Sequence, residues 1–418
     1  MMGQPTPLSE DLLEVGSYLV AAIVNWPEWC HRKVESFDLL EGRRGRRRIS
    51  LDCSPRPLTW AEQGASFPSS LVPLTYMTKA TLRDFDVRNE QGTPVPVLGT
   101  EANALLAASA IAFLISIEQG QAAARSHWDI ICRVTSGSPD DAEAAAGELI
   151  MSVAPDYLTA ALIRDLARNF LLIAVIPLDT RDKRQVLKYS YHWEAKALGA
   201  SGWVGRLLAG LGFASFALEL EMNALDSASS YHLECSAPRG LLCDQIQLPR
   251  DSSGIAPTDA QRTPVGHAHG RYGWDEAKDP ADASVSFVID PMGLPPRVAW
   301  SAAAVALIFA GLLLVPNAYT SLTDSVDAAT ALLLFVPALL IALGAKGTEN
   351  DIASRLLRTL RTMAYTLSLL LYMAGVMLVF KAPEEVARAA WTASGVVSLL
   401  IYLAIVFGMA RLKVSGKN

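Results

Sequence analysis

The chain has 418 residues, of which 51% are hydrophobic, and a formal net charge of −6 at pH 7. The first 295 residues hold 26 Lys and Arg against 36 Asp and Glu, whereas residues 296–418 hold 10 against 6. This acidic amino-terminal region excludes general nucleic-acid binding, which needs a positive surface to displace counterions. The five cysteines lack the spacing of a disulfide framework, so we expect reduced, mostly buried thiols.

A helical segment is expected over residues 1–33, followed by a cytosolic β-rich domain over 34–292. Near the start of this domain, a short run holds five arginines: Arg43, Arg44, Arg46, Arg47 and Arg48. On a domain tethered to the cytoplasmic leaflet, such a run is a candidate for contact with anionic headgroups, worth about 1 kcal/mol per basic residue near the surface. The alternative is a solvated hairpin leading into the next strand.

Alternating apolar and polar residues indicate half-buried strands in several parts of this domain. The segments are 48–53, a hairpin of 81–88 with 95–98, 186–195, 218–224, 231–237 and 285–289. Many short strands separated by polar turns predict a sandwich-like antiparallel sheet. The Gly-rich residues 198–213 are expected to form a loop packed on the sheet, with an interfacial segment touching lipid as the alternative. Residues 251–270 are the most loop-like of the chain.

A helical insert is predicted over about 99–170, with helices at 101–119, 140–153 and 154–169. Residues 104–117 form an uncharged apolar run that is shorter than a membrane-spanning helix, and its length is typical of a buried core helix. A further membrane crossing is the alternative.

Known catalytic motifs are absent from the sequence: it has no phosphate loop, dinucleotide fingerprint, zinc-protease motif or nucleophile elbow. The best cluster is His267 and His269, which an extended strand would place on one face, together with His232 of another predicted strand. Their spacing matches no established zinc pattern, so they are weak metal candidates. We predict no cofactor.

Four uncharged apolar stretches fill the last part of the chain, over about 298–315, 328–345, 363–380 and 391–410. Each is about as long as a helix that crosses a hydrocarbon core. They predict a four-helix transmembrane domain over 296–418. Because ion-coupled pathways usually carry charge inside the membrane, uncharged spans favour an anchor or assembly element over a pump.

Charges in the loops predict the orientation. Basic residues concentrate between the second and third spans, where Arg355, Arg358 and Arg361 lie, and after the last span. Since short Lys- and Arg-rich loops stay in the cytoplasm, both termini are expected to be cytoplasmic. The three arginines are further candidates for headgroup contact, and Trp300, Tyr319 and Trp391 are expected to anchor the spans at the membrane interfaces.

The predicted fold is therefore an α+β cytosolic domain, β-rich and sandwich-like with a helical insert, followed by a C-terminal four-helix transmembrane bundle. We expect a multi-pass plasma-membrane protein that acts as a non-enzymatic anchor, sensor or scaffold. Its expected partners are anionic inner-leaflet lipids, a cytosolic protein or small ligand, and a second copy of itself, with no nucleic acid. Two alternatives stay open: a membrane-tethered hydrolase or metal-dependent enzyme, and an oligomeric channel or membrane-disrupting effector gated by the cytosolic domain.

Overall fold

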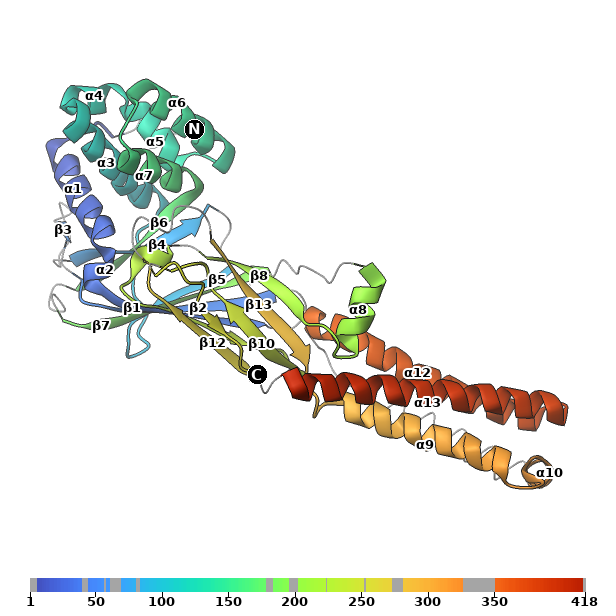
Figure 1. The fold of residues 1–418 in the computed structure, drawn as a ribbon. Coiled ribbons are helices and arrows are strands. Elements are labelled where there is room, and N and C mark those ends of the chain that lie inside the picture. Colours follow the sequence, from blue (N-terminus) through green and yellow to red (C-terminus); the bar gives the residue numbers. More distant parts are fainter. Residues whose placement is uncertain are drawn as a thin grey trace.

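The structure is a computed structural model. It describes residues 6–39, 44–55, 58–60, 69–79, 83–177, 183–194, 202–222, 224–251, 253–272, 281–325 and 350–415. A layer of helices lies at one end of the molecule, β-sheets form the middle, and a rod of long helices projects from the other end (Figure 1).

The helical layer contains α1 and α2 from the amino terminus and five helices from the insert. They are α1 (Glu10–Val24), α2 (Trp26–Trp29), α3 (Thr100–Gln119), α4 (Gln121–Ser126), α5 (Trp128–Ser136), α6 (Pro139–Val153) and α7 (Tyr157–Arg168). Ser138 caps the predicted start of α6, and α7 begins three residues later than predicted, where Asp156 accepts a hydrogen bond from the backbone N–H of Thr159 at 2.8 Å.

Helix α3 is long and apolar enough to cross a membrane, yet it belongs to the domain core. It packs against α1 and α5, and its side chains Leu106, Ile111 and Ile115 are fully buried. Figure 1 places it in the helical layer, at the opposite end of the molecule from the rod. The run 104–117 is therefore a core helix.

A six-stranded sheet, which we call sheet A, is central to the domain. Its strand order is β12 (Val265–Gly270), β9 (Tyr231–Ser236), β1 (Cys30–Leu39), β2 (Arg44–Cys53), β7 (Gln185–Glu194) and β5 (Arg83–Arg88). The pairing of β1 with β9 is parallel, and the other pairings in this sheet are antiparallel. The predicted antiparallel arrangement is confirmed for four of the five pairings; β9, which comes about half the chain after β1, adds to β1 in the parallel direction.

Two smaller sheets complete the β-rich part. One has the order β11 (Thr258–Asp259), β10 (Leu241–Gln247), β13 (Ala281–Ile289) and β8 (Phe216–Met222). The other has the order β3 (Leu58–Trp60), β4 (Ser69–Thr78) and β6 (Asn169–Pro177). Strand β8 alternates strictly between buried and exposed residues, as predicted. Strands β11 and β12 replace the loop expected over 251–270.

Each small sheet belongs to a different hydrophobic core. The first core joins the helical layer to β4, β6 and the inner side chains Ile49, Leu51 and Leu187 of sheet A. The second joins the four-stranded sheet to Tyr231 and Leu233 of β9 and continues into the helices of the rod. Sheet A therefore spans both cores with one face.

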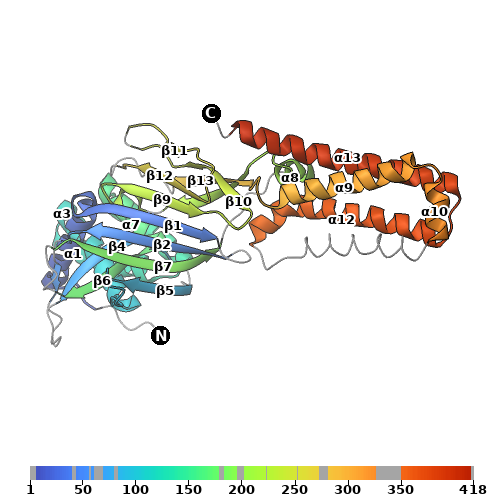
Figure 2. The same cartoon turned by 90° about the horizontal axis from the view of Figure 1, so that it is seen from below.

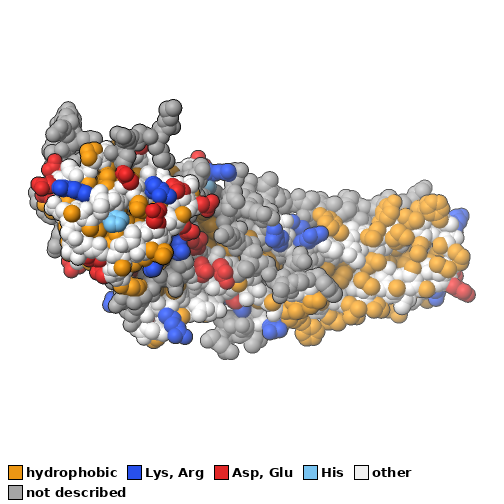
Figure 3. All heavy atoms as spheres, turned by 90° about the horizontal axis from the view of Figure 1, so that it is seen from above, with side chains coloured by type: hydrophobic (Ala, Val, Ile, Leu, Met, Phe, Trp, Pro, Cys, Tyr) orange, Lys and Arg blue, Asp and Glu red, His pale blue; other side chains and the backbone are white. Residues whose placement is uncertain are grey.

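The rod is formed by α9 (Leu294–Leu314), α12 (Asp351–Val379) and α13 (Glu384–Ser415), with the short α10 (Ala318–Asp324) at its far end. These three long helices meet the length and hydropathy of membrane spans. The remaining predicted span, 328–345, lies outside the described residues. Hydrophobic side chains cover much of the rod surface in Figure 3. The chain is thus a multi-pass membrane protein.

Candidate functional site

The domain and the rod are joined by a short, hydrogen-bonded turn between β13 and α9. Strand β13 ends at Ile289 and α9 begins at Leu294. The four residues between them form a turn in which Gly293 N–H donates to the Asp290 carbonyl at 3.1 Å and Met292 N–H donates to the Asp290 carboxylate at 2.9 Å. Because the hydrophobic core also continues across this turn, the domain and the rod pack as one body.

A short helix, α8 (Gly202–Gly210), sits in the angle of this junction. The end of α8 packs on α12, where a Cβ on Gly210 would lie 2.9 Å from the carbonyl oxygen of Leu356. The turn that follows packs on α13, where Gly408 allows the backbone of Leu211 to approach. The expected loop over 198–213 is thus a helix and turn in its described part, seated on two rod helices.

Arg262 fastens the last turn of α13 to the domain. Its Nε donates to Asp244 at 2.6 Å, and its Nη1 donates to the carbonyl of Leu412. An arginine at the carboxyl end of a helix satisfies unpaired carbonyls and interacts favourably with the helix dipole. The end of α13 and the whole domain therefore lie at the same end of the rod.

One face of sheet A is polar and faces away from both cores; we call it the outer face. In Figure 2 strands β9, β1, β2 and β7 lie toward the viewer, and no helix of the described chain covers them. The strand registers align outward side chains in rows. One row from β12 to β5 is His267, Glu234, Ser36, Arg48, Ser190 and Asp86. The next row is His269, His232, Val34, Ser50, Lys188 and Arg88.

A groove of about 340 Å³ opens on the outer face over β1, β2, β7 and β5. Its wall is the turn after β5, and its basic side chains are Arg46, Arg48, Arg88 and Lys188. Asp86 and Glu90 are the acidic side chains that line it. The groove is thus a local excess of positive charge on an acidic domain.

Fixed partners orient the arginines of the groove. Arg46 Nη2 donates to Ser190 Oγ at 3.1 Å, and Arg48 Nη2 lies 2.8 Å from Asp38 Oδ2. Arg88 Nε lies 2.5 Å from Asp86 Oδ2, and its Nη1 donates to the Gly92 carbonyl at 3.2 Å. A guanidinium has five N–H donors, so each arginine keeps donors for a ligand after making these contacts.

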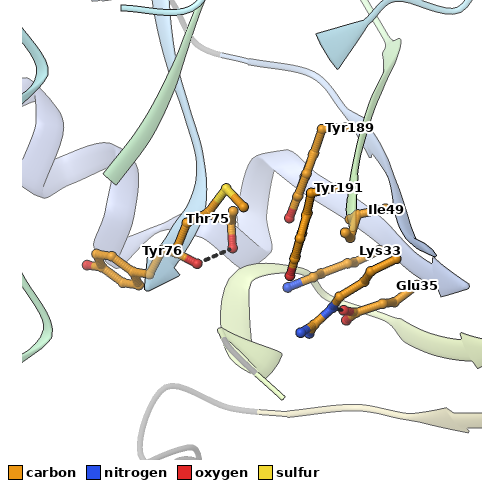
Figure 4. Close-up of a pocket in the computed structure, with 9 residues that line it drawn as sticks. Lys33, Glu35, Ile49, Thr75, Tyr76, Tyr189 and Tyr191 are labelled. Carbon is orange, nitrogen blue, oxygen red and sulfur yellow. Dashed lines mark hydrogen bonds and ion pairs between the residues drawn. The ribbon is translucent and has the colours of Figure 1, made fainter. Parts of the chain in front are cut away.

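The inner face of sheet A carries a set of charged residues at the seam between the two cores; we call it the buried network. It consists of Lys33 and Glu35 on β1, Arg47 on β2, Tyr191 on β7 and Tyr231 on β9. Arg47 forms an ion pair with Glu35, which also accepts a hydrogen bond of 2.6 Å from the Tyr231 hydroxyl. The tyrosines of β7 lie above Lys33 and Glu35 in Figure 4.

Hydrogen bonds tie the buried network to elements beyond sheet A. Arg47 Nη1 donates to the carbonyl of Glu221 on β8 at 3.2 Å. Lys33 Nζ donates to the carbonyl of Ala224 at 3.0 Å, just before the 3₁₀ turn Leu225–Ser227. Buried charges are tolerated only when they are paired and hydrogen-bonded, and this network meets both conditions.

The pKa values within the buried network shift as its geometry requires. Burial lowers the pKa of Lys33 below its ordinary 10.5. Burial tends to raise the pKa of Glu35, but the charges of Arg47 and Lys33 outweigh it and hold this pKa below 4.5. Burial and the nearby Glu35 carboxylate raise the pKa of Tyr231 well above 10. Glu35 is therefore an ionised carboxylate that compensates two buried cations.

The metal candidates lie on the β9–β12 edge of the outer face. The rings of His232 and His269 are 4.6 Å apart, and their Nε2 atoms lie 3.0 and 3.2 Å from Ser230 Oγ. His267 lies on the same face in the neighbouring row, with Nδ1 3.7 Å from Glu234 Oε1. Within the described ranges, no group of three or more His, Cys, Asp or Glu side chains is arranged to hold a metal ion. The structure thus brings together two of the three histidines.

The five arginines of the predicted headgroup contact have different surroundings. Arg43 and the side chain of Arg44 lie outside the described part of the chain. Arg46 and Arg48 face the groove, whereas Arg47 points inward and is 8% exposed. Since Arg47 belongs to the buried network, its guanidinium is not presented to lipid in this structure.

The other predicted basic residues lie where the rod meets the domain. Arg355 and Arg358 are exposed on the first turns of α12, and Arg361 is half-buried one turn later. Figure 3 shows basic side chains gathered at this end of the rod, with hydrophobic side chains beyond them.

The three aromatic residues predicted to lie at the membrane interfaces differ in exposure and in position along the rod. Trp300 is 76% exposed near the domain end of α9. Tyr319 lies at the far end, where its hydroxyl donates to the carbonyl of Ala382. Trp391 is 1% exposed and its ring packs 6.1 Å from that of Tyr319, so its side chain is buried between helices of the rod.

Sequence reasoning missed the groove and the buried network because both combine residues distant in the chain. No protein-family model matches the chain, and no curated protein matches it. Its function must therefore be inferred from its geometry.

Proposed function

We propose that this chain is a non-enzymatic recognition module anchored in the plasma membrane. Its cytosolic domain binds a ligand or partner on the outer face of sheet A, and its rod holds that face in a fixed position relative to the bilayer. The observation that carries the proposal is the continuous junction of β13, α8, α9 and the end of α13, because a tether that only anchors needs no shared core.

The proposed orientation has both termini in the cytoplasm. The domain end of the rod carries arginines on all three long helices: Arg297, Arg355, Arg358, Arg361 and Arg411. The far end carries a nearly balanced set: Asp324, Lys381, Glu384, Glu385 and Arg388. Under the positive-inside rule, this asymmetry supports a cytoplasmic domain end.

Cysteine labelling tests the orientation directly. Four of the five native thiols are buried, so a Cys132→Ser variant has no exposed native thiol to react with the label. In intact cells we expect a membrane-impermeant maleimide to label Ser325→Cys at the far end and to leave Ser253→Cys on the domain unlabelled until the cells are permeabilised. Labelling of Ser253→Cys in intact cells would place the domain outside and reject the proposal.

The basic residues of α12 are proposed to contact anionic headgroups. Changing Arg355 and Arg358 together to glutamine should lower the preference for anionic lipid by about 2 kcal/mol, at about 1 kcal/mol per residue. The measurement is the enrichment of phosphatidylserine over phosphatidylcholine in lipid retained by the purified protein. The control changes the same charge on the helical layer, by Arg125→Gln with Arg164→Gln, both exposed. Equal enrichment in the two double variants would contradict the contact.

A further inference from the structure

We propose that the groove on the outer face binds a small molecule carrying two or more phosphate groups. This inference rests on the proposed function, because it names the ligand class of that face. It also uses the feature that distinguishes the groove from the rest of the domain: four cations against the lining carboxylates Asp86 and Glu90 and the adjacent Asp38, which pairs with Arg48, in a region with a net charge of −10. A positive concave site on an acidic surface focuses its field and draws in anions.

The preference for phosphate comes from the arginines. Arg46, Arg48 and Arg88 contact Ser190, Asp38 and the turn after β5, and these contacts favour orientations in which their remaining donors face the groove. Arginine forks match the oxygens of a phosphate in pairs, and ordering them in advance reduces the entropy lost on binding. Lys188 adds an exposed point charge on the neighbouring strand.

The size and lining of the groove restrict the class of ligand that fits. About 340 Å³ falls at the lower end of the range of small-ligand sites. Tyr189 is the aromatic residue that lines the groove, and it is 4% exposed, so the described residues offer no aromatic platform on which a base could stack. Ser36, Ser50 and Ser190 line the groove between the cations; the Ser36 hydroxyl donates to Glu234 at 3.0 Å, and the Ser190 hydroxyl accepts from Arg46 at 3.1 Å. A phosphorylated polyol or a pyrophosphate group fits this lining.

Two sources can supply this chemistry, namely a soluble polyphosphate and a phosphorylated lipid headgroup. Strand β2 starts at the rod end of the domain, where Figure 2 also places the end of β1. On the paired strands β2 and β7, Arg46 is nearer to this end than Lys188 is, so Arg46 lies on the side of the groove nearer the rod and Lys188 lies farther from the rod.

The test uses the full chain in nanodiscs of phosphatidylcholine, titrated with pyrophosphate by calorimetry. We expect saturable binding that weakens about tenfold or more in Arg48→Gln with Lys188→Gln, since two charge-assisted contacts are removed. The matched control is Arg125→Gln with Arg164→Gln, which should bind as the wild type does. Glu90→Gln removes a carboxylate from the groove and should tighten binding.

A second arm separates the two sources. In nanodiscs that also contain phosphatidylinositol 4-phosphate, a headgroup in the groove would compete with pyrophosphate and lower its apparent affinity; unchanged affinity would identify the soluble source. The proposal is overturned if pyrophosphate does not saturate the protein, or if the control double variant weakens binding as much as the groove variant. Because purified protein exposes both sides of the disc, this result is independent of the labelling test of orientation.

Discussion

Replacing Glu35 by glutamine is expected to destabilise the domain by about 3–5 kcal/mol, because it leaves buried cations without their counter-charge. Glu35 is 0% exposed, and its carboxylate meets Arg47 and the Tyr231 hydroxyl. Lys33, 1% exposed on the same face of β1, also depends on this charge. The measurement is chemical unfolding of the full chain in detergent, followed by near-ultraviolet circular dichroism.

Asp38→Asn provides the control on the same strand. Asp38 faces outward and pairs with Arg48 at the surface, where such pairs contribute about 1 kcal/mol or less. The two substitutions remove one negative charge each, three residues apart, so they differ mainly in burial. Similar losses of stability would show that the buried network contributes no more than a surface pair.

The stability contributed by the buried network should depend on pH in the acid range. The pKa of Glu35 lies below 4.5 in the folded state, because Arg47 and Lys33 outweigh the effect of burial. A carboxylate with a depressed pKa contributes stability that is complete above its unfolded pKa and is lost as pH falls through the folded value. The stability difference between wild type and Glu35→Gln should therefore be constant near neutral pH and shrink below pH 4.5.

The rod and many strands could be predicted because their signals are local. Apolar length identifies spans, and a period of two identifies strands such as β8 and β9, whose buried residues alternate as expected. The core position of α3 followed from its length in the same way. None of these predictions depends on contacts between residues that are distant in the sequence.

The buried network could not be predicted, because strand β1 presents its charges inward. Lys33 and Glu35 are buried while Val34 between them faces the groove, so a hydrophobicity pattern assigns the two faces the wrong way round. Similarly, Arg47 was grouped with its neighbours as a lipid contact. Its partners Glu35 and Glu221 explain its burial, and Glu221 is 174 residues away in sequence.

The direction of the Trp391 side chain in the rod was likewise not predictable from the local sequence. An aromatic residue at the end of a span is typical of an interfacial belt, and Trp300 has the exposure that such a role needs. Trp391 instead fills the space between helices beside Tyr319, a contact set by how α10 folds back onto the rod. Position within a helix predicts depth in the bilayer; it does not predict which way the side chain faces.

Replacing Gly408 by leucine should separate the end of α13 from the domain. A Cβ at this position would overlap the carbonyl oxygen of Leu211, and backbone cannot move aside as a flexible side chain can. Overpacking of this kind costs about 1–3 kcal/mol. Gly212, whose φ of +82° suits glycine, turns the chain against Leu412 at the same contact, so the turn after α8 has little freedom to adjust.

The expected result is a looser junction with an intact domain and rod. Spin labels on Arg239→Cys in the domain and Ser325→Cys at the far end of the rod, in the Cys132→Ser background, should give a broader distance distribution in the leucine variant. Gly311→Leu is the control, because it lies in α9 with open space around its Cβ. It makes the same substitution in a rod helix without touching α8.

The two outcomes distinguish two ways of joining the domain to the membrane. A broader distribution for Gly408→Leu alone would mean that α8, together with the Arg262 contact to Leu412, fixes the angle between sheet and rod. An unchanged distribution would mean that the turn from Ile289 to Leu294 and the shared core suffice without α8. In the first case, a shift of the domain would move α12 and α13 relative to α9, because α8 contacts α12, the turn after α8 contacts α13, and β13 of the four-stranded sheet continues into α9.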